Sequence, residues 1–153
     1  MKKLFAVLLT VALLMSLSVT AFAANTTGGD ADITTSIAPT YTVTIPADVN
    51  VAFNATETDF GAIEVTASQI HPDKCIKVAL ATDGELNNAI DNTKVIPYAI
   101  KDSEGNPFTA ATYLTEGDKT ELSIHITADD WNAAYAGEYF DTVTFTVSYE
   151  NKA

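Results

Sequence analysis

The chain has 153 residues, of which 47% are apolar, 18% charged and 9% aromatic, so we expect a single globular domain. Eight basic residues, all of them lysine, stand against 20 acidic residues, which gives a formal net charge of −12. This charge argues against nucleic acid and anionic membranes as partners, because both bind proteins through basic patches.

Residues 1–23 are predicted to be a signal peptide. Two lysines precede an apolar stretch from Leu4 to about Val19, and residues 21–23 match an A-x-A cleavage site. A membrane anchor is the alternative, but the stretch is shorter than the roughly 20 residues that span a bilayer. Cleavage removes two lysines and leaves a chain that begins at Ala24 with a formal charge of −14 instead of −12. We expect a secreted or extracellular protein without membrane contact after cleavage, whose retention at the cell surface stays open because no C-terminal sorting motif is visible.

Residues 24–31 are predicted to be a flexible N-terminal segment, because they contain little apolar surface. In residues 32–150, apolar and polar residues alternate in short runs that are separated by Gly, Pro, Asn and Asp. This period of two predicts an all-β fold, an antiparallel Ig-like β-sandwich of about 7–8 strands. The clearest runs are Tyr41–Ile45, Val49–Phe53, Ile76–Leu80, Leu122–Ile126 and Val143–Tyr149.

Other segments carry weaker signals. The run Phe60–Val65 contains Gly61, where we expect a β-bulge. The run Val95–Ile100 contains Pro97, which favours an edge strand because proline cannot donate a hydrogen bond to a neighbour. Residues 102–107 have the composition of a hairpin turn. A single helical turn is expected at Glu85–Ile90 and at Asp129–Ala134.

Both ends of the predicted domain have a distinctive sequence. The first strand reads A-P-T-Y-T-V-T-I-P at residues 38–46, and Trp131 is followed by A-G-E-Y at residues 136–139 and T-V-T-F-T at residues 142–146. These stretches resemble small secreted Ig-like β-sandwich proteins of Gram-positive gut bacteria. The last strand is also similar to that of pilin-type and spore-coat-U-type domains. The resemblance implies an extracellular, adhesin-like or fimbria-like surface protein.

Three aromatic residues near this end, Trp131, Tyr135 and Tyr139, can be interpreted as structural residues or as part of a ligand site. Gly137 can form a tight turn, and the hydroxyl of Tyr139 is expected to bind the preceding loop as in a tyrosine corner. Trp131 and Tyr135 could stack on a sugar ring, or Trp131 could fill the core. They are the only candidates for ligand stacking that we select.

The sequence predicts no catalytic residues, so we expect a protein that is not an enzyme. The paired carboxylates Asp129 and Asp130 lack the fixed separation that acid–base catalysis needs, and residues 102–106 offer oxygen ligands for a weak Ca²⁺ site at most. No other cofactor is expected. Cys75 is the only cysteine, and it is interpreted as a half-buried thiol at a strand start or as one half of an intermolecular disulfide.

These observations lead to two functional hypotheses. The first is a non-enzymatic adhesive or assembly subunit of the bacterial surface, which binds itself or other surface proteins by strand addition. The flexible segment and the first residues after it, Asp32–Ile37, would be lent to a neighbour or paired internally. The alternative is a monomeric extracellular binding module for glycan or Ca²⁺.

Overall fold

A computed structural model describes residues 32–152, so the expected signal peptide and the segment 24–31 lie outside the described residues. The described chain is almost entirely β-structure with a short helix, α1 (Ala128–Ala133), and every strand pair is antiparallel. This confirms the all-β sandwich. The strands are β1 (Thr40–Thr44), β2 (Glu57–Gln69), β3 (Lys74–Ala81), β4 (Glu85–Asn88), β5 (Val95–Pro97), β6 (Ala99–Asp102), β7 (Ala110–Tyr113), β8 (Lys119–His125), β9 (Tyr139–Phe140) and β10 (Thr144–Asn151).

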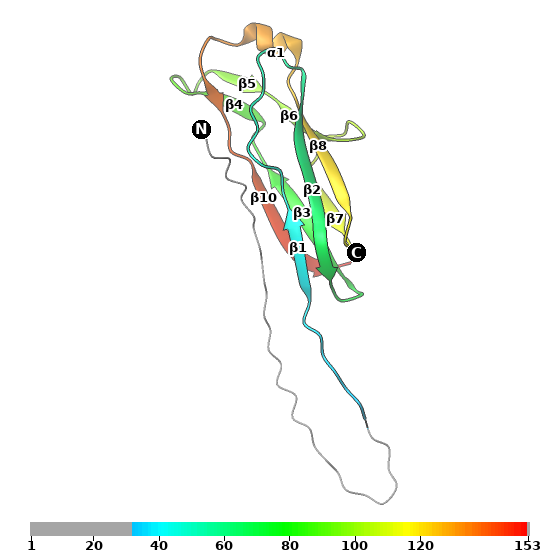
Figure 1. Ribbon diagram of the computed structural model, residues 1–153. Helices are drawn as coiled ribbons and strands as arrows, with labels where there is room; N and C mark the ends of the chain where they lie inside the picture. The colour runs from blue at the N-terminus through cyan, green and yellow to red at the C-terminus, as the bar shows by residue number, and fades with distance from the viewer. Residues whose placement is uncertain (1–31, 153) are drawn as a thin grey trace, which may run out of the picture.

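Seven strands form the two main sheets, in the orders β1-β2-β8-β6 and β10-β3-β7. This division into four and three strands is also found in constant-type immunoglobulin domains. Three short strands, in the order β5-β4-β9, form a third sheet that lies near α1 at one end of the molecule (Figure 1). The number of strands in the two main sheets agrees with the expected 7–8, but β4, β7 and β9 were not expected.

The alternating pattern places one face of each main sheet in a shared core. In β2, Ile63 and Val65 are fully buried, and in β3 the same is true of Ile76 and Val78. β2 is long because a bulge lets it bend: its register shifts between Asp59 and Gly61. Gly61 has φ of 97°, which an L side chain rarely adopts, so the expected bulge is confirmed.

Two local predictions are wrong. Residues 49–53 form no strand, because the chain leaves the edge of β2 after Pro46 and reaches no other partner. Their apolar side chains instead cover an open side of the sandwich, where Val51 packs against the core. Residues 85–88 form β4 rather than a helical turn, because Gly84 turns the chain and Glu85 pairs with Pro97. Long-range pairing here outweighs weak local helix propensity.

The edge strand with Pro97, the turn at residues 102–106 and the helical turn after Thr127 form where the sequence predicts them. The run Val95–Ile100 divides at Tyr98 into β5 and β6, and Pro97 lies on an edge strand as predicted. Residues 102–106 form a tight turn in which the amide of Asp102 donates to the carbonyl of Asn106 at 3.0 Å. The strands on either side of this turn, β6 and β7, belong to different sheets. The predicted helical turn at Asp129–Ala134 is confirmed as α1, which Thr127 caps by accepting a hydrogen bond from the amide of Asp130. No helix of the described chain is long and apolar enough to cross a bilayer.

Candidate functional site

A groove opens along one side of the sandwich, between the segment that follows β1 and the segment that leads into β10. Its volume is about 910 Å³. Residues 45–51 and Phe53 line one wall, and residues 137–143 and Phe145 line the other. The floor consists of core side chains from four strands of the fold, Phe60, Ile96, Ile100 and Ile124. The groove therefore leads directly from the surface to the hydrophobic core.

Both walls have backbone groups without a backbone partner. β1 and β10 are edge strands, and each stops short of the groove, β1 at Thr44 and β10 at Thr144. Within the described residues, no backbone–backbone hydrogen bond involves residues 45–51 or residues 141–143. An extended segment placed in the groove could therefore bind N–H and C=O groups on either side, as strands do when they join an open sheet edge.

Exposed apolar side chains surround the groove. Phe53 and Phe140 are 78% and 62% exposed, and Val49 on the first wall is 39% exposed. The walls also carry polar side chains, among them Asp48, Glu138 and Asp141. The groove thus has an apolar floor and walls of mixed character.

Trp131 makes two contacts with the first wall at one end of the groove. Its indole Nε1 donates a hydrogen bond of 2.8 Å to the carbonyl oxygen of Ala55, and its ring meets that of Phe53 edge to face at 5.6 Å. The indole is half-buried and packs against the core. These contacts anchor the end of the first wall to α1, in agreement with the core interpretation of Trp131.

Tyr135 lies apart from this contact. Its side chain is 63% exposed, and the ammonium of Lys94 sits 4.9 Å from the centre of its ring. Among the aromatic contacts of residues 32–152, none joins Tyr135 to Trp131, so the structure does not bring the two candidate stacking residues together. Tyr139 binds the backbone of Tyr135 twice, donating to its carbonyl at 3.0 Å and accepting from its amide at 3.1 Å. The expected tyrosine corner is therefore present.

A polar network fixes the second wall. The hydroxyl of Tyr98 donates to Oδ2 of Asp141, and Thr82 contacts the same hydroxyl at 2.7 Å. Burial, followed by the bond to Asp141, raises the pKa of Tyr98 far above its usual value. Because Thr82 follows β3 and Tyr98 links β5 to β6, the network ties residue 141 to two other parts of the fold. This wall is therefore held in place although the backbone of residues 141–143 has no backbone partner.

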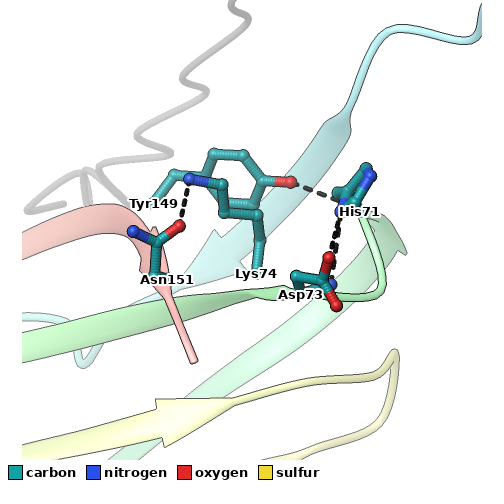
Figure 2. Close-up of polar contacts among 5 residues, drawn as sticks. All are labelled: His71, Asp73, Lys74, Tyr149 and Asn151. Carbon is teal, nitrogen blue, oxygen red and sulfur yellow. Dashed lines mark hydrogen bonds and ion pairs between the residues drawn. The ribbon is translucent and has the colours of Figure 1, made fainter. Parts of the chain in front are cut away.

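A second cluster lies at the far end of β10, and Figure 2 shows its contacts. The amide of His71 donates to the hydroxyl of Tyr149 at 2.9 Å, and Lys74 Nζ donates to Asn151 Oδ1 at 2.6 Å. His71 Nδ1 also lies 3.7 Å from a carboxylate oxygen of Asp73. All of these contacts are exposed to solvent. The cluster fastens the end of β10 to the turn between β2 and β3, and it does not enclose a reaction site.

The other candidate residues have structural surroundings. Cys75 is 4% exposed, and its sulfur lies 3.7 Å from the carbonyl oxygens of Glu150 and Asn151, so an intermolecular disulfide would require local opening. Oδ1 of Asp102 accepts hydrogen bonds from two amides of its own turn. Within the part of the chain that the structure describes, no three His, Cys, Asp or Glu side chains gather as a metal site would require.

Sequence reasoning did not find the groove. The alternation of Val49, Val51 and Phe53 with smaller or polar residues predicts a strand where the structure has the first wall. Pro46 was the available signal, since it interrupts pairing just where β1 ends. Comparison of the chain with models of protein families, with curated proteins and with solved structures gave no match.

Proposed function

We propose that the chain is a secreted, non-enzymatic adhesive or assembly subunit of the bacterial cell surface or extracellular space, which associates with other proteins by accepting an extended segment. The groove carries this proposal, since its walls include backbone without a backbone partner at residues 45–51 and 141–143. The sequence of residues 1–23, with its A-x-A site, supports export.

Strand addition suits this groove for two physical reasons. Main-chain hydrogen bonds supply affinity that depends little on sequence, and alternate side chains on the apolar floor supply specificity. The walls offer exposed apolar side chains to a partner, Val49, Phe53 and Phe140, whereas Ile96 and Ile100 on the floor are already packed into the core. A catalytic site would need positioned acid, base or nucleophilic groups, whereas the floor here is apolar.

A monomeric glycan-binding module is the second candidate, and the exposed ring of Tyr135 favours it. The ammonium of Lys94 lies over one face of this ring, and the indole of Trp131 donates its hydrogen bond to the carbonyl of Ala55. A sugar would therefore find a single free aromatic face, which supports weaker binding than a platform of two rings.

Light scattering coupled to size-exclusion chromatography tests the proposal. The chain from Ala24 onward contains every described residue, and we expect its mean mass to rise above that of a monomer as concentration increases. The Cys75→Ser variant, and the original chain with reductant, serve as controls for an oxidised dimer. A monomer at every concentration, with no binding to other surface proteins of the same bacterium, would overturn the assembly hypothesis and leave the binding module.

A further inference from the structure

We infer that two copies of this chain associate through the free edge of β10, in antiparallel pairing about a twofold axis at Val147. The pairing joins the two three-stranded sheets β10-β3-β7 into one continuous sheet. This inference goes beyond the proposed function, because it does not require that a segment enters the groove. It depends on the composition of β10, on the backbone groups that β10 leaves free, and on the register in which the strand fits itself.

β10 is a long edge strand without the usual protection. Within the described residues its only neighbour is β3, and the two strands pair over eight residues without a shift of register (Figure 1). Residues 142–149 read T-V-T-F-T-V-S-Y and contain neither proline nor a charged residue. Proteins normally protect an edge with such residues, with a bulge or with a short strand, because a long uncharged edge pairs with other strands.

The other edge strands of the described chain carry these protections. β1 has a shift of register against β2 and lies between Pro39 and Pro46. β6 and β7 have four residues each, and β6 includes a lysine and an aspartate. β5 ends at Pro97, and β9 has two residues. A partner is therefore expected at β10 rather than at another edge.

The pairing with β3 determines which backbone groups of β10 are free. The amide of Leu80 in β3 donates to the carbonyl of Thr109, just before β7, at 2.8 Å, so the backbone of Leu80 faces β7. Successive residues of a central antiparallel strand bond to opposite neighbours, so Ala79 bonds to β10, where it lies opposite Thr146. The N–H and C=O groups at the free edge are therefore those of the alternate residues Phe145, Val147 and Tyr149.

The side chains of these three residues are incompletely covered. They lie on the core-facing side of β10 and are half-buried, whereas Ile76 and Val78 of β3 are fully buried. β3 has a strand on each side, and β10 has one on a single side. A strand beside β10 would therefore cover apolar surface and bind the free backbone groups at the same time.

The strand fits a second copy of itself. When Val147 of one copy lies opposite Val147 of the other, antiparallel order sets Phe145 opposite Tyr149 on both sides of the axis. Every residue in these pairs has a free N–H and a free C=O, so each pair can exchange two hydrogen bonds. Aromatic side chains also lie opposite each other in this register, which stabilises cross-strand pairs.

The solvent-facing side of β10 is compatible with the same register. Thr146 of one copy meets Ser148 of the other, and Thr144 meets Glu150, so no two carboxylates are opposed. Each copy carries a net negative charge, which makes most other contacts between copies repulsive. Because the same surface serves both partners, the contact closes on itself, and the expected assembly is a dimer.

Charge substitution at the edge tests the inference in the chain from Ala24 onward, with reductant present to exclude a disulfide through Cys75. Thr146→Asp with Ser148→Asp would oppose carboxylates across the axis, and we expect it to weaken dimerisation about tenfold or more in sedimentation equilibrium. The matched control is Ala110→Asp with Thr112→Asp, which adds the same charge to exposed positions at the other edge of the same sheet. It should weaken dimerisation by less than about threefold. An equal effect of the two variants would overturn the inference.

Charge reversal tests the register and controls for misfolding. A chain with Thr146→Lys and Ser148→Lys should also dimerise weakly, but its mixture with the variant that carries the two aspartates should form heterodimers at least as tightly as the unchanged chain forms its dimer. Such recovery shows that both chains are folded. A mixture that does not associate would overturn the inference, and so would an unchanged chain that stays monomeric at every concentration. In that last case the proposed function would still be decided by binding to other surface proteins.

Discussion

Truncation of Phe145 tests whether the groove is open, because this side chain lies on β10 between the core and the second wall. The ring is half-buried and packs at 6.1 Å from that of Phe60. Full burial of a Phe side chain contributes about 1.5–3 kcal/mol, so half of that is about 1–1.5 kcal/mol. The aromatic pair adds about 0.5–1.5 kcal/mol. The variant Phe145→Ala should therefore lose about 1.5–3 kcal/mol of unfolding free energy.

Two further variants, measured by urea unfolding at neutral pH, give a lower and an upper reference for the loss of unfolding free energy in Phe145→Ala. Thr144→Ala, on the exposed face of the same strand, should change the unfolding free energy by less than about 0.5 kcal/mol. Ile63→Ala, in the closed part of the core, should cost about 2–5 kcal/mol because it leaves a cavity. A loss for Phe145→Ala below about 0.5 kcal/mol would refute the strand register. A loss above that of Ile63→Ala would show that the space beside Phe145 is closed rather than open.

Four further outcomes are expected. Gly137→Ala should cost about 2–3 kcal/mol in urea unfolding, because residue 137 has φ of 152° and the new Cβ would lie 2.5 Å from Nδ2 of the buried Asn88. Gly105→Ala, with positive φ and no such contact, should cost less. Trp131→Phe should cost about 1 kcal/mol in the same assay through loss of the bond to Ala55. Hydrogen bonds from the amides of Leu114 and Thr115 lower the pKa of Asp118, so Asp118→Asn should destabilise at pH 7 and progressively less as the pH falls below about 4, as acid titration of stability would show. The intact mass of protein recovered from the culture medium should correspond to a chain that begins at Ala24.

The sequence predicts several strands and the face that each of them buries, but it does not predict how the strands are placed relative to one another. Alternation in β3, β8 and β10 identifies the buried face, because side chains two residues apart point the same way. Gly61 and Pro97 indicate a bulge and an edge, since glycine permits the positive φ of a bulge and proline cannot donate a hydrogen bond to a neighbouring strand. These effects depend on a few neighbouring residues, so they can be predicted from the sequence.

The groove was not predictable in the same way. Its floor joins Phe60 to Ile124, which are brought together only when β2 pairs with β8. The alternation in residues 49–53 has the period of a strand, but a strand also needs a neighbour, and Pro46 gives only a local sign that pairing ends, without showing where the chain goes next. β4 illustrates the converse case, in which pairing with β5 and β9 makes a strand from a segment with little strand signal.

A complete core beside an open groove would make the proposed association reversible. Within residues 32–152, no buried side-chain nitrogen or oxygen of the structure lacks a hydrogen-bond partner, and both main sheets contribute fully buried residues such as Val65 and Val78. The subunit can therefore fold alone, because the main determinants of its stability are already satisfied. The groups without a partner include the backbone of residues 45–51 and 141–143 and exposed apolar side chains at the groove, such as Phe53 and Phe140. Under the proposed function, a partner strand would gain binding energy from these groups without being required for folding, and association would then depend on the concentration of subunits.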